Sequence, residues 1–532
     1  MRATLQSLRE MDLPILARVG VIYRRAALAL LLVGLAAILF LAARDFLWAT
    51  GSHGIGVRTD SVAYLWGAEN LADGVGMGRL DGLGRLKPMT HWPPFYPLVL
   101  TGFELAGVPA LEGARWLGVA TVVILLALSA LTILRMTRSI WFALGAALLI
   151  YYIPDLWVTS LDAMTEPLYI VLGLGGALLL DCYLEKREQA AFWLSAVLMA
   201  LALLTRYVGI VLILAACLTL LMMGGRRWTE NLKQAIAYGL LSILPLGLWM
   251  LRNLLTAGSA TNRALNVIPI APTDWTLLAE TIDGWFYPLQ TAFSIGAGKL
   301  VILAVAAGLF VILRLSEKAD HKTEESTAKP GLRLALFYAI YLLVYPVFVI
   351  LSRLLFDRMI TIFEERIAFP AFLALLFLVI FAAWWLLQQA ARRHVLAGAA
   401  LAALYAITLW TFVVLYQEEQ ARVINNTHEW GRSLNTPSML EGSFARATRQ
   451  IDDDVLIISD NLEILYFISG RHSFQINEAT VQALDAVKAY DVDHRVAFVL
   501  FYSRDIARLA QSEMPNLEIF YQDDNASILI EK

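Results

Sequence analysis

Three carboxylates of this sequence stand beside long apolar runs, where a charged side chain is costly to place. Asp60 lies near the start of TDSVAYLWGAENLADG, and Asp162 and Glu166 lie four residues apart in DLWVTSLDAMTEPLY. An ionisable side chain in such a position marks a functional site by default. A carboxylate fixed at a membrane surface could act as a general base that takes a proton from an attacking hydroxyl group.

A purely structural role is the alternative for each of these acids. Asp60, or Thr59, would cap a short interfacial helix by accepting a hydrogen bond from a free N–H group of its first turn. Asp162 and Glu166 would share one helix face if the turn between them is helical. Thr165 would then cap the helix that Glu166 opens. In the functional interpretation, we expect Glu166 and Asp162 to face the same cavity as Asp60.

Cationic side chains occur at a similar depth, on the side of the chain where arginine is otherwise scarce. Several arginines that face two acidic clusters favour a site for an anion such as phosphate. Snorkelling of each side chain to the membrane surface is the alternative. Lys87 and His91, in the proline- and aromatic-rich segment 84–100, are further candidates, although an isolated histidine is more often structural. The candidate arginines are Arg206, Arg252, Arg353, Arg358 and Arg366.

The composition of the whole chain predicts an integral membrane protein. Of 532 residues, 59% are hydrophobic and 16% are charged, whereas soluble domains carry about 25% charged residues. The net charge of −3, with no basic patch that contains interleaved aromatic residues, argues against nucleic-acid binding, and both cysteines lie within apolar runs, which excludes a disulfide framework. Because about 20 apolar residues cross a bilayer, eleven helical spans are predicted at 26–43, 114–134, 140–154, 166–183, 190–205, 208–223, 234–251, 298–314, 333–351, 367–388 and 395–416.

Basic residues in the short loops predict how the chain is oriented in the membrane. They gather before the first span and in every second loop, whereas segment 155–165 has no Lys or Arg. The N-terminus is therefore expected in the cytoplasm, behind an uncleaved first anchor, and the C-terminus outside it. Three large segments would lie on the outer face, at 44–113, at 252–297 and from 417 onwards, and the charged linker 319–331 would be cytoplasmic.

The pattern divides the chain into a transmembrane part, 1–416, with a large first outer loop, and a small extracytoplasmic α/β domain, 417–532. The second part contains no glycine-rich phosphate loop, so no nucleotide is assigned to it. A lid and an acceptor platform both remain open as its role. Its expected elements are strands at 454–460 and 495–503, helices at 461–470 and 505–513, and further strands at LEIFY and SILIE.

Together these features resemble the membrane-embedded GT-C glycosyltransferases, near the branch of the protein O-mannosyltransferases and the lipid A aminoarabinose transferases. The resemblance covers most of residues 20–470 and rests on the order of motifs that are weak individually. One span precedes a long outer loop, which opens with an acidic helix and continues into a proline–aromatic stretch. The later motifs are Glu166-Pro167 at the fourth span, Arg206 at the sixth, Trp249-x-x-Arg252-Asn253 at the end of the seventh, and ERIAFP at 365–370.

Members of this family use polyprenyl- or dolichyl-phosphate sugars and transfer the sugar outside the cytoplasm. The resemblance implies a hexosyl- or pentosyltransferase of the bacterial inner membrane, with Asp60 as general base of an inverting transfer to a lipid, glycan or protein acceptor. Asp162 and Glu166 would orient the acceptor or the sugar hydroxyls. Ser61 stands where many relatives have a second acid. Relatives with monophosphate donors generally need no metal, so no cofactor is expected, although the three carboxylates leave a divalent cation open.

The resemblance also implies cations that hold the donor phosphate at the outer face. Arg206 and Arg366 are expected to do so, whereas Arg252 is expected to be more structural than ligand-binding. Where relatives often show Lys-Pro-Pro-Leu, this chain has His91-Trp-Pro-Pro. Lys87 or His91 would therefore take the place of the missing lysine.

A membrane transporter or flippase of lipid or polyprenyl-linked substrates is the main alternative function. Transporters commonly show paired halves or broken helices near the midplane, but no convincing internal repeat occurs here and the polar residues gather on one face. A transferase of the O-antigen ligase type would centre on a late outer loop, whereas here the early loop is rich in candidate residues. A structural scaffold would not need acids and arginines that converge on one side.

The predicted topology can be tested with single-cysteine variants in intact membranes. A cysteine in the linker 319–331 should react only with reagents that reach the cytoplasm, and one beyond residue 417 only with reagents outside it. Three predicted spans separate the two positions, so they must lie on opposite sides. Labelling of both positions from one side would contradict the topology.

Overall fold

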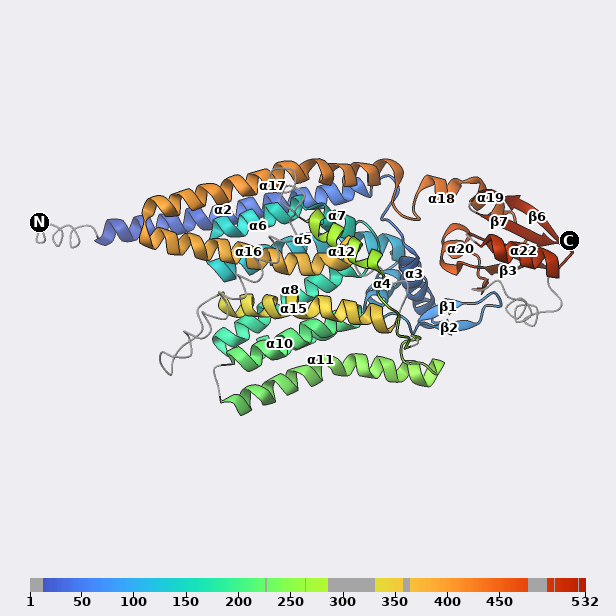
Figure 1. Cartoon of the computed structure of the whole chain (residues 1–532), viewed down its shortest axis with the longest axis horizontal. Helices are drawn as coiled ribbons and strands as arrows, with labels where there is room; N and C mark the ends of the chain where they lie inside the picture. The colour runs from blue at the N-terminus through green and yellow to red at the C-terminus, as the bar shows by residue number, and fades with distance from the viewer. Residues whose placement is uncertain are drawn as a thin grey trace, which may run out of the picture.

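Long helices that run along the longest axis of the molecule form most of the structure (Figure 1). The computed structural model describes residues 13–224, 227–263, 265–285, 331–356, 364–476, 495–501, 503–524 and 526–532. The helices of this bundle are α2 (Leu13–Ala49), α5 (Ala110–Thr137), α6 (Ile140–Tyr152), α7 (Pro154–Ser160), α8 (Glu166–Lys186), α9 (Gln189–Thr205), α10 (Gly209–Met223), α11 (Trp228–Ala257), α15 (Leu332–Leu355), α16 (Glu365–Arg393) and α17 (Val395–Trp430).

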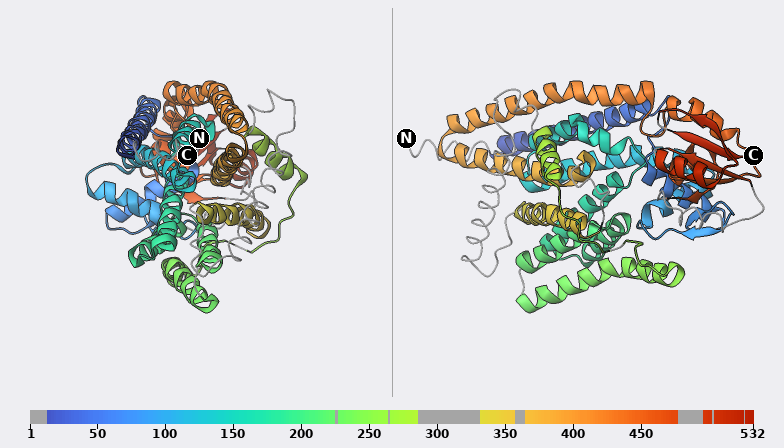
Figure 2. Two further views of the ribbon diagram at one scale, coloured as in Figure 1. Left: turned by 90° about the vertical axis from the view of Figure 1, so that its left-hand side faces the viewer. Right: turned by 45° about the vertical axis from the view of Figure 1, so that its right-hand side comes forward.

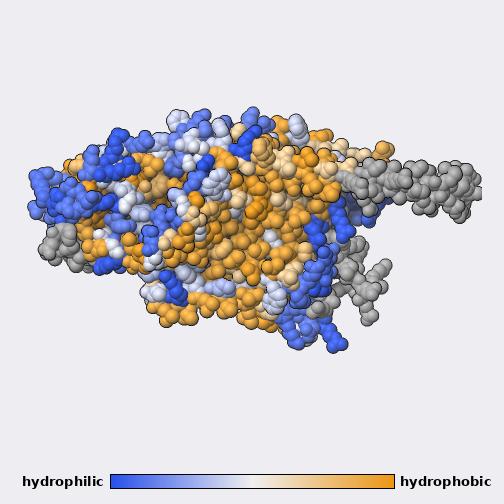
Figure 3. All heavy atoms as spheres, turned by 180° about the vertical axis from the view of Figure 1, so that it is seen from behind, coloured by the Kyte–Doolittle hydropathy of each residue, from blue (hydrophilic) through white to orange (hydrophobic). Residues whose placement is uncertain are grey.

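Within the described residues, seven helices are long and apolar enough to cross a membrane, and an eighth span results if α6 and α7 are one helix bent by 60°. The other two predicted spans that fall on described residues are α9 and α10, with 17 and 15 residues. The span predicted at 298–314 lies outside the described residues, as does linker 319–331 except for Gly331. A polytopic membrane architecture is thus confirmed, whereas the structure does not establish eleven crossings. Apolar side chains cover the middle of the molecule in Figure 3.

Helix α8 lies at the centre of the bundle, and 78% of its most apolar stretch is buried. Its glycines allow close approach of neighbouring helices, because a Cβ atom at Gly173 would come within 2.9 Å of Leu212 on α10. Near its C-terminus, Asp181 accepts hydrogen bonds from Arg135 on α5 and from Arg333 on α15, at 2.6 and 2.8 Å. These contacts fix α8 against three neighbouring helices.

The segment predicted as the first outer loop folds into a short helix, a hairpin and a second short helix: α3 (Thr59–Ala72), β1 (Gly78–Leu80), β2 (Leu86–Pro88) and α4 (Phe95–Leu105). Arg58, and neither Thr59 nor Asp60, occupies the N-cap position of α3, and its backbone N–H donates to Ser61 Oγ at 3.0 Å. The capping role considered for Asp60 is therefore wrong. Prolines keep segment 84–94 out of regular helix, and Pro97 is accommodated in the first turn of α4.

The C-terminal part is a mixed α/β domain with one five-stranded sheet in the order β4-β3-β5-β7-β6. In β3 and β5, odd-numbered side chains such as Ile457 and Val499 pack under α19 (Ser443–Arg449) and α20 (Leu462–Ser469), and even-numbered ones such as Ile458 and Phe498 pack under α22 (Arg504–Glu513). The predicted strands and helices are confirmed, and residue 416 lies inside α17. The elements are α18 (Pro437–Glu441), α19 (Ser443–Arg449), β3 (Leu456–Ser459), α20 (Leu462–Ser469), β4 (Phe474–Gln475), β5 (Val496–Leu500), α22 (Arg504–Glu513), β6 (Leu517–Gln522) and β7 (Ser527–Glu531).

This domain sits against α3 and the β1–β2 hairpin at one end of the bundle (Figures 1 and 2). Tyr466 of α20 stacks on Trp66 of α3, with ring centroids 4.0 Å apart and planes within 3°. The Tyr466 hydroxyl donates to Glu69 at 2.9 Å, and Arg79 of the hairpin pairs with Glu463 at 3.3 Å. The helix that begins beside Asp60 is therefore held by the C-terminal domain.

Three segments that are distant in the sequence cross where α2 leads into α3. Gly56 exchanges backbone hydrogen bonds with Leu161 and Ala163, at 2.9 and 2.8 Å. Val57 accepts from the backbone N–H of Leu434 at 2.8 Å, and Asn435 donates its side-chain amide to the carbonyl oxygen of Ile55 at 2.9 Å. The start of the first outer loop is therefore clamped between the α7–α8 connection and the segment after α17.

Replacement of Gly56 by alanine tests this crossing. A Cβ atom at Gly56 would overlap the carboxylate of Asp162 and touch Arg432 at 3.0 Å. Gly56→Ala should therefore lower the free energy of unfolding by about 1–3 kcal/mol, as overpacking of a well-packed site does, and lower the Tm in detergent. Gly102→Ala on α4 is the matched control, because nothing lies within 4 Å of its Cβ position. An unchanged Tm for Gly56→Ala would contradict the packing.

Candidate active site at the N-terminal end of helix α8

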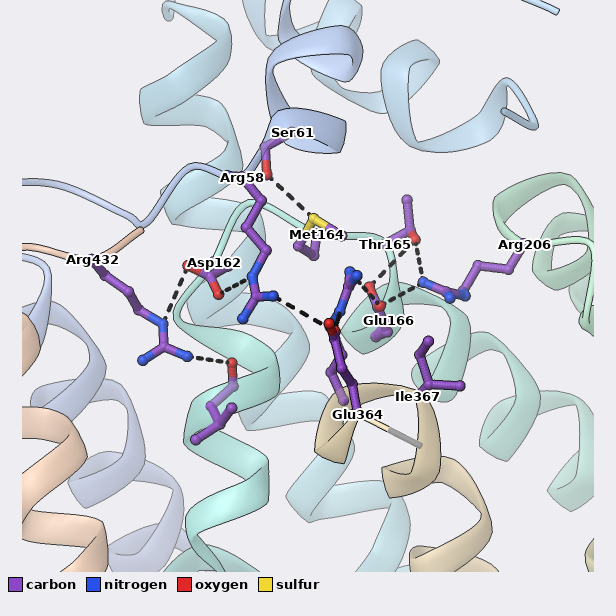
Figure 4. A network of polar contacts seen from close by, with 12 residues as sticks. Arg58, Ser61, Asp162, Met164, Thr165, Glu166, Arg206, Glu364, Ile367 and Arg432 are labelled. Atoms are coloured by element: carbon purple, nitrogen blue, oxygen red, sulfur yellow. Dashed lines mark hydrogen bonds and ion pairs between the residues drawn. The ribbon is translucent and has the colours of Figure 1, made fainter. Parts of the chain in front are cut away.

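Glu166, the first residue of α8, is the centre of a buried group of charges (Figure 4). Its side chain is 1% exposed, and its Oε1 atom accepts from Nη1 of Arg206 at 2.6 Å and from Nη1 of Arg366 at 3.3 Å. Arg206 lies between α9 and α10 and also donates to Thr165 Oγ1 at 3.0 Å. The structure thus brings Glu166, Arg206 and Arg366 together, as expected for one site.

Asp162 is the centre of a second group, formed with different arginines. Its Oδ2 atom accepts from Nε of Arg58 at 2.8 Å, and its Oδ1 atom pairs with Arg432 at 3.2 Å and accepts from Ser433 Oγ at 2.9 Å. Helix α7 ends at Ser160, so the turn after it is not helical. The expectation that Asp162 and Glu166 share a helix face is therefore wrong, because each carboxylate meets its own pair of arginines.

Glu364 joins the two groups into one network (Figure 4). Its Oε2 atom accepts from Nε of Arg366 at 2.6 Å and lies 3.7 Å from Nη1 of Arg58. Among the residues that the structure describes, the contacts named here join four arginines and three carboxylates. These seven groups carry one more positive than negative charge.

Asp60 lies in the first turn of α3, two residues after Arg58 of this network. Burial raises the pKa of its carboxyl group, whereas the charge of Arg366 lowers the pKa, that of Glu166 raises it, and those of Arg206 and Arg263 lower it. These four groups therefore lie within electrostatic range of Asp60. In the described part of the chain, the Asp60 carboxylate takes part in no hydrogen bond or ion pair. It is a carboxylate surrounded by cations but not bound to one.

Arg263 is the cation near Asp60 that the sequence interpretation missed. Its Nη2 atom lies 3.3 Å from Nε2 of His91, and its guanidinium lies over the ring of Tyr207 at 5.7 Å. Among the described residues, its buried Nε atom has no hydrogen-bond partner. Arg263 is the only basic residue between positions 253 and 298. That isolation in an outer segment was the signal available in the sequence.

The other predicted residues take separate positions around this centre. His91 contacts Arg263, whereas Lys87 is exposed and lies 3.8 Å from Asp81. Arg252 donates from Nη1 to Asn253 Oδ1 at 3.0 Å and lies over the ring of Trp249 at 4.8 Å. These contacts favour the structural role expected for Arg252. In the part of the chain that the structure describes, no three His, Cys, Asp or Glu side chains converge as metal ligands would.

Arg58 and Arg432 were also missed, because each becomes a partner of Asp162 only through the fold. Arg432 lies 270 residues after Asp162 and beyond the last bundle helix. Arg58 directly precedes the helix of Asp60, and its charge could have been noticed there. No local pattern pairs either residue with Asp162.

Two cavities have lining residues close to Asp60 in the sequence. The first has a volume of about 680 Å³ and is lined by α7, α12 (Pro272–Gly284), α16 and α17, with Arg58 and Arg366 in its wall. An apolar groove of about 330 Å³ between α6, α16 and α17 shares Ile153, Trp285 and Tyr416 with this cavity. The second, of about 530 Å³, is lined by α3, the hairpin, the end of α11 and the C-terminal domain. In the sequence, Asp60 lies between Arg58, which lines the first cavity, and Ala63, which lines the second.

Comparisons with known proteins give matches to solved structures alone, since no protein-family model and no curated protein matches. ArnT from Cupriavidus metallidurans, bound to undecaprenyl phosphate, is 14% identical with a TM-score of 0.51, over 94% of this chain and 97% of that one. The Archaeoglobus fulgidus oligosaccharyltransferase, in complex with Zn and sulfate, is 11% identical with a TM-score of 0.52, over 89% and 69%.

The same archaeal oligosaccharyltransferase, AglB, in complex with an inhibitory peptide and a dolichol-phosphate, is 11% identical with a TM-score of 0.50, over 94% of this chain and 74% of that one. At such identities the likeness concerns the fold. It spans nearly the whole chain, including the outer loop and the C-terminal domain. The resemblance that the sequence indicated is confirmed at this level: the chain has the fold of the GT-C glycosyltransferases.

Proposed function

We propose that this protein is a glycosyltransferase that moves a sugar from a polyprenyl-phosphate donor to a hydroxyl-bearing acceptor at the outer membrane face. The observation that carries the proposal is Asp60, a partly buried carboxylate without an ion-pair partner among the described residues, surrounded by Arg206, Arg263 and Arg366. A base must be free to accept a proton, and the arginines around it supply charge for a phosphate. The likeness to ArnT with undecaprenyl phosphate and to AglB with a dolichol-phosphate supports this donor class.

In the proposed reaction, Asp60 accepts the proton of the acceptor hydroxyl while its oxygen forms a bond to the anomeric carbon. The bond between that carbon and the phosphate oxygen breaks, and its electron pair leaves with the lipid phosphate. A single displacement of this kind inverts the anomeric centre. Burial raises the pKa of Asp60, which makes its carboxylate a stronger base than an exposed aspartate.

The arginines would stabilise the negative charge that develops on the leaving phosphate. Glu166 uses only Nη1 of Arg206 and of Arg366, so each guanidinium keeps further N–H groups for a phosphate. Glu166 then acts as the residue that positions these two arginines, in place of orienting sugar hydroxyls. Arg263, which contacts His91 and has no carboxylate partner among the described residues, would supply the additional charge.

The apolar groove and the larger cavity give the lipid donor a place in this scheme. The groove lies between membrane helices α6, α16 and α17, and its end at Ile153, Trp285 and Tyr416 opens into the cavity of Arg58 and Arg366. An isoprenoid chain would lie in the groove, with its phosphate toward the arginines. The part 417–532 would then lie outside the membrane, as a domain that covers the site formed by 1–416.

The decisive test is Asp60→Asn, which keeps the shape of the side chain and removes its basicity. Transfer should fall by a factor of about 10²–10⁴, while expression, Tm and donor binding stay unchanged. The measurement is turnover of a radiolabelled polyprenyl-phosphate sugar by the purified protein in detergent.

In the wild type, kcat/KM should be lost as the pH is lowered through the pKa of Asp60, because the deprotonated form is active. Since burial raises that pKa, the loss should occur above the usual aspartate value of about 4. Near-normal turnover of Asp60→Asn would refute the assignment.

The phosphate assignment is tested by direct binding of a short-chain polyprenyl phosphate. Arg263→Ala breaks no ion pair among the described residues, so it should fold normally and lose about 1.5–3 kcal/mol of binding free energy. Arg206→Lys and Arg366→Lys keep the charge near Glu166 but should lose affinity, because lysine cannot bind phosphate bidentately. Arg252→Ala serves as the control and should bind normally. Unchanged affinity in all three test variants would remove the arginines from the donor site.

A further inference from the structure

The second cavity, here called the hairpin cleft, shares no lining residue with the Arg58–Arg366 cavity. It is lined by Ala63 and Trp66 of α3, by the β1–β2 hairpin and by Gln475 and Glu463 of the C-terminal domain, and its volume is about 530 Å³. This volume lies within the range of about 300–1,000 Å³ that small-molecule sites occupy. It is large enough for more than one sugar ring.

The charged side chains of the hairpin cleft are paired with one another. Arg79 lies 3.3 Å from Glu463 and donates to Gln475 at 3.2 Å, and Lys87 lies 3.8 Å from Asp81. Because these charges offset each other, the cleft offers many donors and acceptors without a net attraction for an anion. Such a lining suits an uncharged ligand with many hydroxyl groups.

Two buried donors of the cleft lining have no hydrogen-bond partner among the described residues. They are Nε1 of Trp66, whose side chain is 1% exposed, and Oγ of Ser473, whose residue is 2% exposed. A buried donor without an acceptor costs about 1–3 kcal/mol. Both residues belong to the cleft lining, where ligand oxygens would supply the acceptors that these two groups lack.

The cleft leads toward the proposed base. Ala63 follows Asp60 by three residues on α3, so both lie on one side of the helix. His91, in the cleft wall, contacts Arg263, whose charge acts on Asp60. A ligand in the cleft would therefore lie beside the part of α3 that carries Asp60, and it would share no lining residue with the apolar groove.

From this geometry, and resting on the proposed transferase function, we propose that the hairpin cleft binds the acceptor and that the acceptor is an uncharged carbohydrate. The C-terminal domain supplies one wall of this site, which gives the domain a part in acceptor selection. A lipid acceptor is disfavoured, because the lining of the cleft contains four charged side chains, whereas the lining of the apolar groove contains none.

The test is direct binding to the full-length protein in detergent, measured by calorimetry with mannotriose, cellotriose and the N-acetylglucosamine trimer, and with their phosphorylated forms. At least one neutral trisaccharide should bind. Ser473→Ala and Gln475→Ala should each weaken this binding about 2–10-fold, the loss of one hydrogen bond. Gln522→Ala, an exposed glutamine on β6 away from the cleft, is the matched control and should bind as the wild type does.

Asp60→Asn separates this inference from the proposed function, because it should abolish transfer and keep trisaccharide binding. Binding in the wild type with full turnover of Asp60→Asn would overturn the base assignment and leave the cleft standing. The cleft proposal is overturned if no neutral trisaccharide binds, if only the phosphorylated forms bind, or if Ser473→Ala and Gln475→Ala bind as well as Gln522→Ala.

Discussion

The burial of Glu166 is the constraint on which the site depends. A carboxylate that is 1% exposed needs cations that compensate for its lost hydration. Arg206 provides one from the break between α9 and α10, and Arg366 provides the other from the start of α16. One carboxylate thereby ties the ends of these helices to the start of α8. Asp181 repeats the pattern near the other end of α8, where it also holds two arginines, so the central helix is fixed at both ends.

The same pairing decides which acid remains available for chemistry. Glu166 and Asp162 are both held in ion pairs with arginines from other parts of the bundle. The charges of Arg206 and Arg366 act on Asp60, which forms no ion pair with either residue. The paired carboxylates of Glu166 and Asp162 therefore orient the arginines, whereas the carboxylate of Asp60 has no ion-pair partner among the described residues. An arginine and a carboxylate in a direct ion pair would neutralise each other. Asp60 instead lies near Arg206 and Arg366 without being paired to either of them.

Much of this could be read from the sequence, because it follows from local rules. Apolar length predicted the bundle, and alternation of apolar residues predicted the strands of the C-terminal sheet. The costly position of a charge beside an apolar run singled out Glu166, Arg206 and Arg366, and they meet. The ion pairs could not be predicted in the same way. Asp162 lies four residues from Glu166, but the chain leaves the helical path after Ser160, so Asp162 pairs with Arg58 and Arg432 instead. Arg432 reaches it only through tertiary contacts.

The crossing of residues 55–57 between 161–163 and 433–435 has a consequence for biosynthesis. A membrane chain is inserted from its N-terminus, so the first outer loop and Asp162 leave the translocation channel long before Arg432 is made. Until then, Asp162 lacks its arginine partner Arg432, and the carbonyl oxygen of Val57 lacks the backbone N–H of Leu434. The site is therefore completed only when the last membrane helix has been delivered. A nascent chain that stops earlier lacks the contacts from 433–435 that clamp residues 55–57, so this crossing forms only after the segment beyond α17 has been made.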